Sequence, residues 1–146
     1  MTDLKLLALD NEDLEVLSAC LQDAVVRVED MGFAKSDNRF ALLVNRYAWE
    51  AGEKKSAGER KRCALRFDRV LSVQVAGVDL DARDGVLELL TIAFQPGEVP
   101  EGEVTLTFAG GGTVRLVVEC LEARLNDLGA AWAAKGRPSH ALSDTN

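Results

Sequence analysis

The residues best suited to recognise another molecule lie together in the run Asn45-Arg46-Tyr47-Ala48-Trp49. Arginine, tyrosine and tryptophan are the residue types that contribute most of the binding energy at protein interfaces. Strand alternation places Asn45, Tyr47 and Trp49 on one face and Arg46 on the other. The run therefore predicts a partner-binding surface made of Asn45, Arg46, Tyr47 and Trp49. A structural alternative stays open, in which Trp49 covers an edge of the core and Arg46 pairs with a nearby acid.

A basic segment follows this run almost immediately. Five positive charges fall within nine residues, at Lys54, Lys55, Arg60, Lys61 and Arg62. Lysine and arginine on a loop rich in glycine and glutamate suit phosphate groups or an acidic protein surface. The segment 54–62 therefore predicts an anion-binding site, and the alternative is a solvated loop that aids solubility. The net charge of −7 disfavours non-specific binding of the whole surface to nucleic acid or to anionic membranes.

Other residue patterns that could form a catalytic, metal-binding or phosphate-binding site are weak. His140 is the only histidine, which excludes multi-histidine metal sites and leaves a histidine-based active site dependent on the C-terminal tail. The run Gly110–Thr113 lacks the lysine of a phosphate-binding loop and fits a hairpin turn. The acidic segment Asp79–Gly85 departs from the calcium-loop spacing and fits a solvated turn. The three cysteines, Cys20, Cys63 and Cys120, have no paired spacing and are interpreted as buried thiols. We therefore predict no catalytic residue, metal ligand or cofactor.

The elements that must position these residues follow from hydrophobic periodicity. Asp10 is a helix N-cap for an amphipathic helix over 11–23. Strands are expected over 24–34, with a bend at 30–32, and over 39–49. The alternation over 63–76 is long for one strand, so a sharp turn is expected near Asp68-Arg69. A strand over 86–94 is apolar enough to be covered on both faces.

The stretch from Gly102 to Trp132 organises the rest of the chain. It predicts a strand, a glycine turn, a second strand and then an amphipathic helix with Leu121, Leu125, Leu128 and Trp132 on one stripe. The whole chain is thus expected to be α+β, with about seven antiparallel strands in a bent sheet or a small open barrel. The N-terminal helix and the C-terminal helix would pack on it, in an element order that resembles the pleckstrin-homology-like fold. The expected domain covers 1–135, followed by a flexible tail at 136–146.

A resemblance to a known family covers nearly the whole chain, from about Leu4 to Gly129. It rests on the stretches LSACLQDAV (17–25), FALLVNRYAWE (40–50), RCALRFDRVL (62–71) and residues 111–128. These stretches are similar to an uncharacterised bacterial family, catalogued as domain of unknown function 2948 and found in alphaproteobacteria. The family has no assigned activity, so the resemblance implies a bacterial setting and transfers no functional residue.

The leading functional hypothesis is a non-catalytic binding or adaptor module for a protein partner. One alternative is an anion or nucleic-acid binder that works through 54–62, although nucleic acid is the less favoured partner. Another is an enzyme that uses carboxylates and arginine in a pocket at the end of a barrel. Self-association is also open, because the apolar strands 40–44 and 86–94 would pair with a second copy if they had an exposed edge. The N-terminus lacks a secretory pattern and no apolar run could span a membrane, so the expected location is the cytoplasm.

Overall fold

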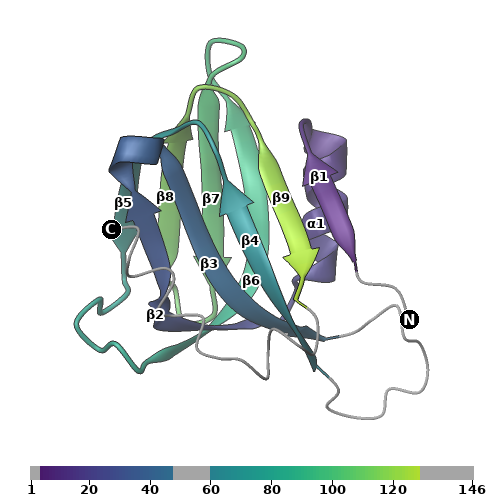
Figure 1. Ribbon diagram of the computed structural model, residues 1–146. Helices are drawn as coiled ribbons and strands as arrows, with labels where there is room; N and C mark the ends of the chain where they lie inside the picture. Colours follow the sequence, from purple (N-terminus) through teal and green to yellow (C-terminus); the bar gives the residue numbers. More distant parts are fainter. Residues whose placement is uncertain (1–3, 48–59, 129–146) are drawn as a thin grey trace.

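The computed structural model describes residues 4–47 and 60–128, which form one helix, one short 3-10 helix and nine strands (Figure 1). In chain order the elements are β1 (Lys5–Ala8), α1 (Asn11–Cys20), β2 (Val25–Ala34), η1 (Lys35–Asp37), β3 (Arg39–Tyr47), β4 (Arg60–Phe67), β5 (Val70–Ala76), β6 (Val86–Pro96), β7 (Gly102–Phe108), β8 (Thr113–Val118) and β9 (Ala123–Asp127). All strand pairs are antiparallel, in the order β1-β9-β4-β3-β2-β6-β7-β8-β5. The predicted mostly antiparallel sheet is confirmed, and within the described residues it is accompanied by one α-helix.

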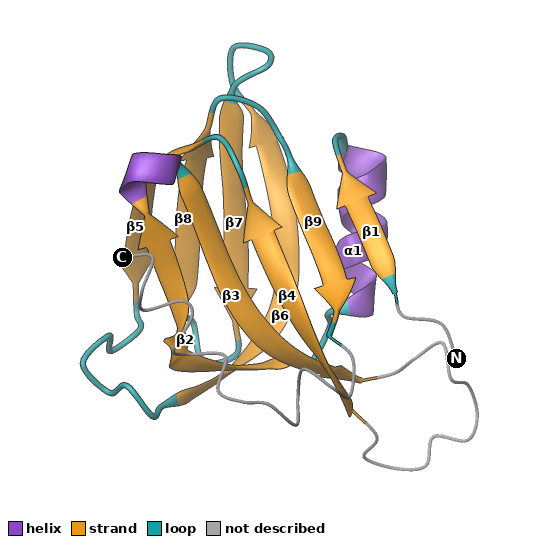
Figure 2. Cartoon of the chain, viewed as in Figure 1, coloured by secondary structure: helices purple, strands orange, loops and turns teal. Residues whose placement is uncertain are grey.

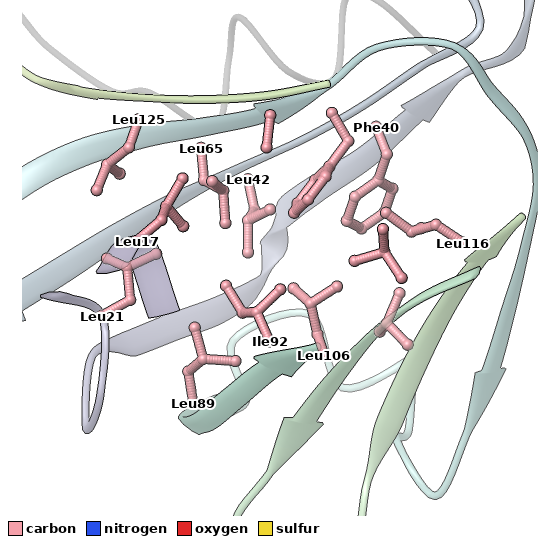
Figure 3. Packing of buried hydrophobic residues seen from close by; sticks show 14 of the residues in the cluster. Leu17, Leu21, Phe40, Leu42, Leu65, Leu89, Ile92, Leu106, Leu116 and Leu125 are labelled. Atoms are coloured by element: carbon pink, nitrogen blue, oxygen red, sulfur yellow. The ribbon is translucent and has the colours of Figure 1, made fainter. Parts of the chain in front are cut away.

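The sheet is strongly bent, and the bend creates the core. Strands β2 and β6 pair only where Val25–Arg27 meets Val86–Glu88. The sheet folds at this short junction, which brings the front half (β1, β9, β4, β3 and β2) over the back half (β6, β7, β8 and β5) (Figure 2). The two inner faces pack aliphatic and aromatic side chains against each other. Figure 3 shows this packing for Leu42, Leu65 and Leu125 of the front half and Leu89, Ile92 and Leu106 of the back half.

Helix α1 packs beside β1 and β6 at one side of this core. Asp10 caps its first turn, because its Oδ1 accepts the backbone N–H of Asp13 at 2.9 Å. Leu14 and Leu17 of the helix are fully buried. Ser18 Oγ also accepts the Ile92 N–H at 3.0 Å, which ties the helix to β6. The predicted helix and its N-cap are therefore confirmed, although the helix ends at Cys20.

Two chain segments cross side by side between the halves of the sheet. One joins β4 to β5 through Asp68 and Arg69, and Arg69 has a left-handed φ of 62°. The other joins β8 to β9 over residues 119–122. Backbone hydrogen bonds link the two crossings, from Asp68 N–H to Glu122 O at 3.0 Å and from Glu119 N–H to Arg69 O at 2.9 Å. The sharp turn expected near Asp68-Arg69 is confirmed.

Strand β2 is irregular, but at residues 27–30 and not over the predicted 30–32. The pairing with β3 passes from Val26 opposite Val44 to Met31 opposite Leu42, so residues 27–30 stand opposite Leu43 alone. This bulge turns outward, and its backbone bonds to residues 83 and 85 instead of to β3. It therefore leaves a hollow beside Leu43 on the outer side of the sheet.

Three sequence predictions differ from the structure. The helix expected through Leu121, Leu125 and Leu128 is wrong, because Ala123–Asp127 is strand β9 between β1 and β4. Nine strands replace the expected seven, and the pleckstrin-homology-like order is not confirmed. Strand β6 was expected to be covered on both faces, but only Leu89 and Ile92 of its residues are buried. The tail predicted at 136–146 lies outside the described residues.

Candidate functional site

The outer side of the front half carries a concentration of arginine. Along β3, β4 and β9 the apolar side chains point into the core, and every second residue points outward. Five of the outward residues are arginines, which we call the arginine face: Arg39, Arg60, Arg62, Arg66 and Arg124. Register places them on three adjacent strands, so residues far apart in the sequence share one surface.

One end of the arginine face joins the two predicted binding segments. Asn45 lies opposite Arg62, and Tyr47 lies opposite Arg60. The Arg60 guanidinium carbon sits 3.9 Å from the centre of the Tyr47 ring, which is a cation–π contact. Arg62 Nη1 donates to Asn45 Oδ1 at 3.1 Å, and its Nη2 donates to Asp30 Oδ2 at 3.3 Å. The structure therefore brings together Asn45 and Tyr47 of the predicted partner-binding set and Arg60 and Arg62 of the predicted anion-binding set.

A hollow of about 220 Å³ opens beside this end, between the β2 bulge and β3. Its polar lining consists of Arg27, Asp30, Asn45 and Arg62. Asp30 is only 3% exposed. Burial raises the pKa of Asp30 above its ordinary value, and the charge of Arg62 only partly offsets this effect. The hollow thus offers an arginine and an amide beside a carboxyl group that is poorly stabilised as an anion.

The other end of the arginine face is built around Asp68. Its carboxylate accepts Arg39 Nε at 2.9 Å and Arg66 Nε at 3.0 Å. Burial alone would raise the pKa of Asp68, but the hydrogen bond and the charges of these arginines lower it below its ordinary value. A second hollow, of about 360 Å³, lies here between the arginines and the acidic residues Glu119 and Glu122 of the β8–β9 crossing.

The charged residues at the outward positions of β3, β4 and β9 are all arginines. Arg66 stands directly opposite Arg124, a cross-strand pairing of like charges that is unfavourable by itself. Asp68 is shared by two of the arginines, and Glu122 is shared by Arg124 and Arg69. Among the described residues, Arg124 Nε is buried and has no hydrogen-bond acceptor. A ligand cannot reach this buried Nε, so only the exposed parts of the arginine side chains could meet an anion, and at this end they lie beside Asp37, Asp68, Glu119 and Glu122.

Arg46 has a different place, in the interior. Its side chain is 0% exposed, and it forms a two-pronged ion pair with Asp127 of β9, from Nε to Oδ1 at 3.0 Å and from Nη2 to Oδ2 at 2.8 Å. The Asp127 carboxylate also accepts the Leu4 N–H at 2.9 Å and the Cys63 thiol at 2.9 Å. Burial would raise the pKa of Asp127, but the hydrogen bonds from Arg46, Cys63 and Leu4 lower it. Burial and the neighbouring carboxylate raise the pKa of the Cys63 thiol, so this thiol is poorly nucleophilic.

The remaining predicted site residues are only partly placed. Lys61 lies opposite Arg46 in register, on the other side of β4 from the arginine face. Trp49, Lys54 and Lys55 lie outside the described residues. The binding roles assigned to all of these residues stay predictions. Sequence reasoning missed Arg39, Arg66 and Arg124, because they are single arginines on separate strands and only the sheet register reveals their proximity.

Comparison with known proteins identifies the family. The model of a family of proteins of unknown function, DUF2948, matches residues 4–140. The chain belongs to the DUF2948 family. No curated protein and no solved structure matches the DUF2948 chain. Within 4–47 and 60–128, no helix has the length and apolarity to cross a membrane. The same residues contain no group of three or more His, Cys, Asp or Glu side chains placed to hold a metal ion.

Proposed function

We propose that the DUF2948 chain is a non-catalytic binding module that holds an acidic segment of a partner protein on the arginine face. The observation that carries this proposal is the concentration of guanidinium groups on three adjacent strands of a chain with a net charge of −7. The side chains of Arg39, Arg66 and Arg124 are each 40–42% exposed, so they combine a fixed position with access to a ligand. Guanidinium groups bind carboxylates through paired hydrogen bonds, which suits this geometry.

A protein segment fits this face better than a nucleic acid does. Proteins that bind single strands stack successive bases on several aromatic side chains. Among the described residues, Tyr47 is the one aromatic side chain that β3, β4 and β9 present outward, and Arg60 already packs on its ring. The acidic chain as a whole would also repel a polyanion of high charge density. An acidic peptide needs fewer charge contacts than a nucleic acid does, and it needs no aromatic side chains on which bases stack.

The alternative that the protein is an enzyme is supported by one hollow only. It requires a pocket that combines a carboxyl group of raised pKa with an arginine, and Asp30 and Arg62 meet this description at the 220 Å³ hollow. The two groups are bound to each other, however, and the space between the sheet halves is filled by Leu, Val and Phe. We therefore favour binding over catalysis, and we propose that this binding takes place in a bacterial cell, as the family resemblance implies.

The test uses a fluorescent oligoglutamate peptide and the full chain. We expect binding at low salt that weakens as salt screens the contacts. The variant Arg66→Gln/Arg124→Gln should raise the Kd about 30-fold, if each guanidinium contributes about 1 kcal/mol. The matched control is Arg83→Gln/Arg115→Gln, which removes the same charge from two exposed arginines that are not on β3, β4 or β9. Its Kd should change by less than about threefold, since distant exposed charges are screened.

The outcomes separate the alternatives. Equal weakening by both variants would show that only net charge matters and would refute a defined face. No binding of the peptide at about 50 mM salt would refute the proposal. Tighter binding of an oligonucleotide than of the peptide, with a steep salt dependence, would replace it by the nucleic-acid alternative. Thermal unfolding of each variant verifies that the loss of binding is not a loss of folding.

A further inference from the structure

The hollow beside the β2 bulge contains a carboxyl group whose hydrogen bonding is incomplete. Asp30 precedes Met31, which packs against the core opposite Leu42 of β3, so the Asp30 side chain points to the outer side of the sheet. It is nevertheless only 3% exposed. Among the described residues, its Oδ2 accepts Arg62 Nη2 at 3.3 Å and its Oδ1 accepts no hydrogen bond. Buried polar groups are nearly always hydrogen-bonded, so this oxygen requires an explanation.

The unpartnered oxygen of Asp30 stays within reach of a ligand. Asp30 lines the hollow of about 220 Å³. Within the described part of the chain, the one side-chain nitrogen or oxygen that is completely enclosed without a partner is Arg124 Nε. Asp30 Oδ1 is therefore not completely enclosed, and the hollow gives a hydrogen-bond donor access to it. Burial raises the pKa of Asp30, which agrees with a carboxyl group that has too few donors.

A hydrogen-bond donor lines the same hollow. Asn45 Oδ1 accepts Arg62 Nη1 at 3.1 Å, so the amide nitrogen of Asn45 is the group that remains for another molecule. Among the described residues, Asn45 Nδ2 has no acceptor. Arg62 thus holds both neighbours, Asn45 through Nη1 and Asp30 through Nη2. The hollow therefore offers one free acceptor and one free donor, and a single guanidinium group fixes the position of both.

The charges around the hollow favour a neutral ligand. Arg27 Nη1 lies 3.2 Å from Glu29 Oε2. Arg62 is paired with Asp30, so each guanidinium group that lines the hollow has its own carboxylate. An anion would meet the Asp30 carboxylate, and a cation would meet two guanidinium groups. A neutral polar molecule avoids both repulsions.

The size and the remaining lining of the hollow limit the ligand further. Pockets for drug-sized molecules begin at about 300 Å³, so this hollow suits a single ring or a single side chain. Besides the polar groups, four aliphatic residues line it: Val25, Val26, Leu43 and Val86. The ligand is therefore small, and it has an apolar part beside its polar group.

We propose that this hollow binds a small neutral group that carries an N–H donor beside a C=O acceptor, as in a carboxamide or a lactam ring. The N–H donates to Asp30 Oδ1, and the C=O accepts from Asn45 Nδ2. Two sources share this chemistry: the side chain of a glutamine or asparagine, and a free heterocycle such as a pyrimidine base. The inference does not rest on acidic peptides binding the arginine face, because this ligand is uncharged. It also differs from the self-association expected through strands 40–44 and 86–94, since β3 lies between β4 and β2, β6 lies between β2 and β7, and neither strand ends the sheet.

Titration of the full chain with uracil, followed through the NMR signals of the Leu43 and Val86 methyl groups, tests the proposal. A ligand of this size should bind with a Kd of about 1 mM. Uracil methylated at both ring nitrogens keeps its C=O groups but has no N–H donor, so it should bind at least about tenfold more weakly. Propionamide, the side-chain fragment of glutamine, distinguishes the two sources. Binding of propionamide assigns the hollow to a protein side chain, and binding of uracil alone assigns it to a free heterocycle.

Two variants separate the acceptor from the donor. Asp30→Leu removes the free oxygen, whereas Asn45→Asp keeps an acceptor for Arg62 and removes the free N–H, and each should raise the Kd of the bound probe at least about tenfold. The matched control Asp84→Leu removes an exposed carboxylate that does not line the hollow, so the Kd should change less than about twofold. No binding of either probe at about 10 mM, or equal binding of uracil and its methylated form, would overturn the proposal. So would an unchanged Kd in a folded Asp30→Leu or Asn45→Asp variant.

Discussion

The buried ion pair between Arg46 and Asp127 permits a quantitative prediction. We expect Arg46→Met to destabilise the fold strongly. The substitution leaves the Asp127 carboxylate buried with the Leu4 N–H and the Cys63 thiol as its remaining described donors. Removal of one partner from a buried pair costs about 3–5 kcal/mol. A domain of this size has a total unfolding free energy of about 5–15 kcal/mol, so the loss is a large fraction of it.

The pH dependence gives this prediction a second observable. The pKa of Asp127 is lowered in the folded chain, so its stabilising contribution is complete above the unfolded value of 3.8 and is lost as the pH falls through the folded value. Arg46→Met removes most of this contribution. The difference in unfolding free energy between the natural sequence and the variant should therefore be largest at neutral pH and should shrink below about pH 4.

Urea unfolding at pH 7 and at acidic pH measures both the loss of unfolding free energy and its pH dependence. The double variant Arg46→Met/Asp127→Asn removes the unpaired charge and should recover about 2 kcal/mol of the loss. The control is Arg115→Met, because Arg115 is half exposed and 3.8 Å from Glu103, and it should cost less than about 1 kcal/mol. A cost below about 1 kcal/mol for Arg46→Met, with no pH dependence, would refute the assignment of a buried, charged pair.

Three further predictions follow from single positions. The Cys63 thiol is fully buried with a raised pKa, so a thiol reagent at about pH 8 should modify it far more slowly than the half-buried Cys120, and urea should abolish the difference. Gly102→Ala would place a Cβ 2.6 Å from the Phe94 ring and should lower the unfolding free energy by about 1–3 kcal/mol, measured by its urea midpoint. The pKa of Asp30 is raised from 3.8, so the natural chain should lose stability as the pH rises through this raised value, and the same titration of Asp30→Asn should show no such loss.

The sequence predicts the local elements well where one period dominates. Helix α1 and the turn at Asp68-Arg69 follow from capping, turn chemistry and alternation. The helix predicted over the residues of β9 shows where such reasoning fails. Leu121, Leu125 and Leu128 have helical spacing, but Leu121, Ala123, Leu125 and Asp127 also alternate as a strand, with an aspartate at the last inward position. An aspartate that points into the core argues against a strand, unless a buried partner for its charge is known.

That partner, Arg46, lies 81 residues earlier, and no local pattern connects the two. The same limit applies to the site. The sequence places Asn45, Tyr47, Arg60 and Arg62 close to one another along the chain, and the β3–β4 register joins them in space. The remaining arginines of the face come from the far ends of β3 and β4 and from β9. Which strands become neighbours is decided by the packing of the whole core, so this part of the site could be found only in the structure.

The position of β9 has a consequence for how the chain reaches its folded state. Strand β9 lies between β1 and β4, and it pairs Lys5 of β1 with Asn126. The front half therefore lacks a central strand until nearly all of the described chain has been synthesised. Contacts of such long sequence separation form late and slow the folding of antiparallel proteins. Until then the edge of β4 that pairs with β9 has no partner, and an unpaired strand edge in an incompletely folded chain favours aggregation.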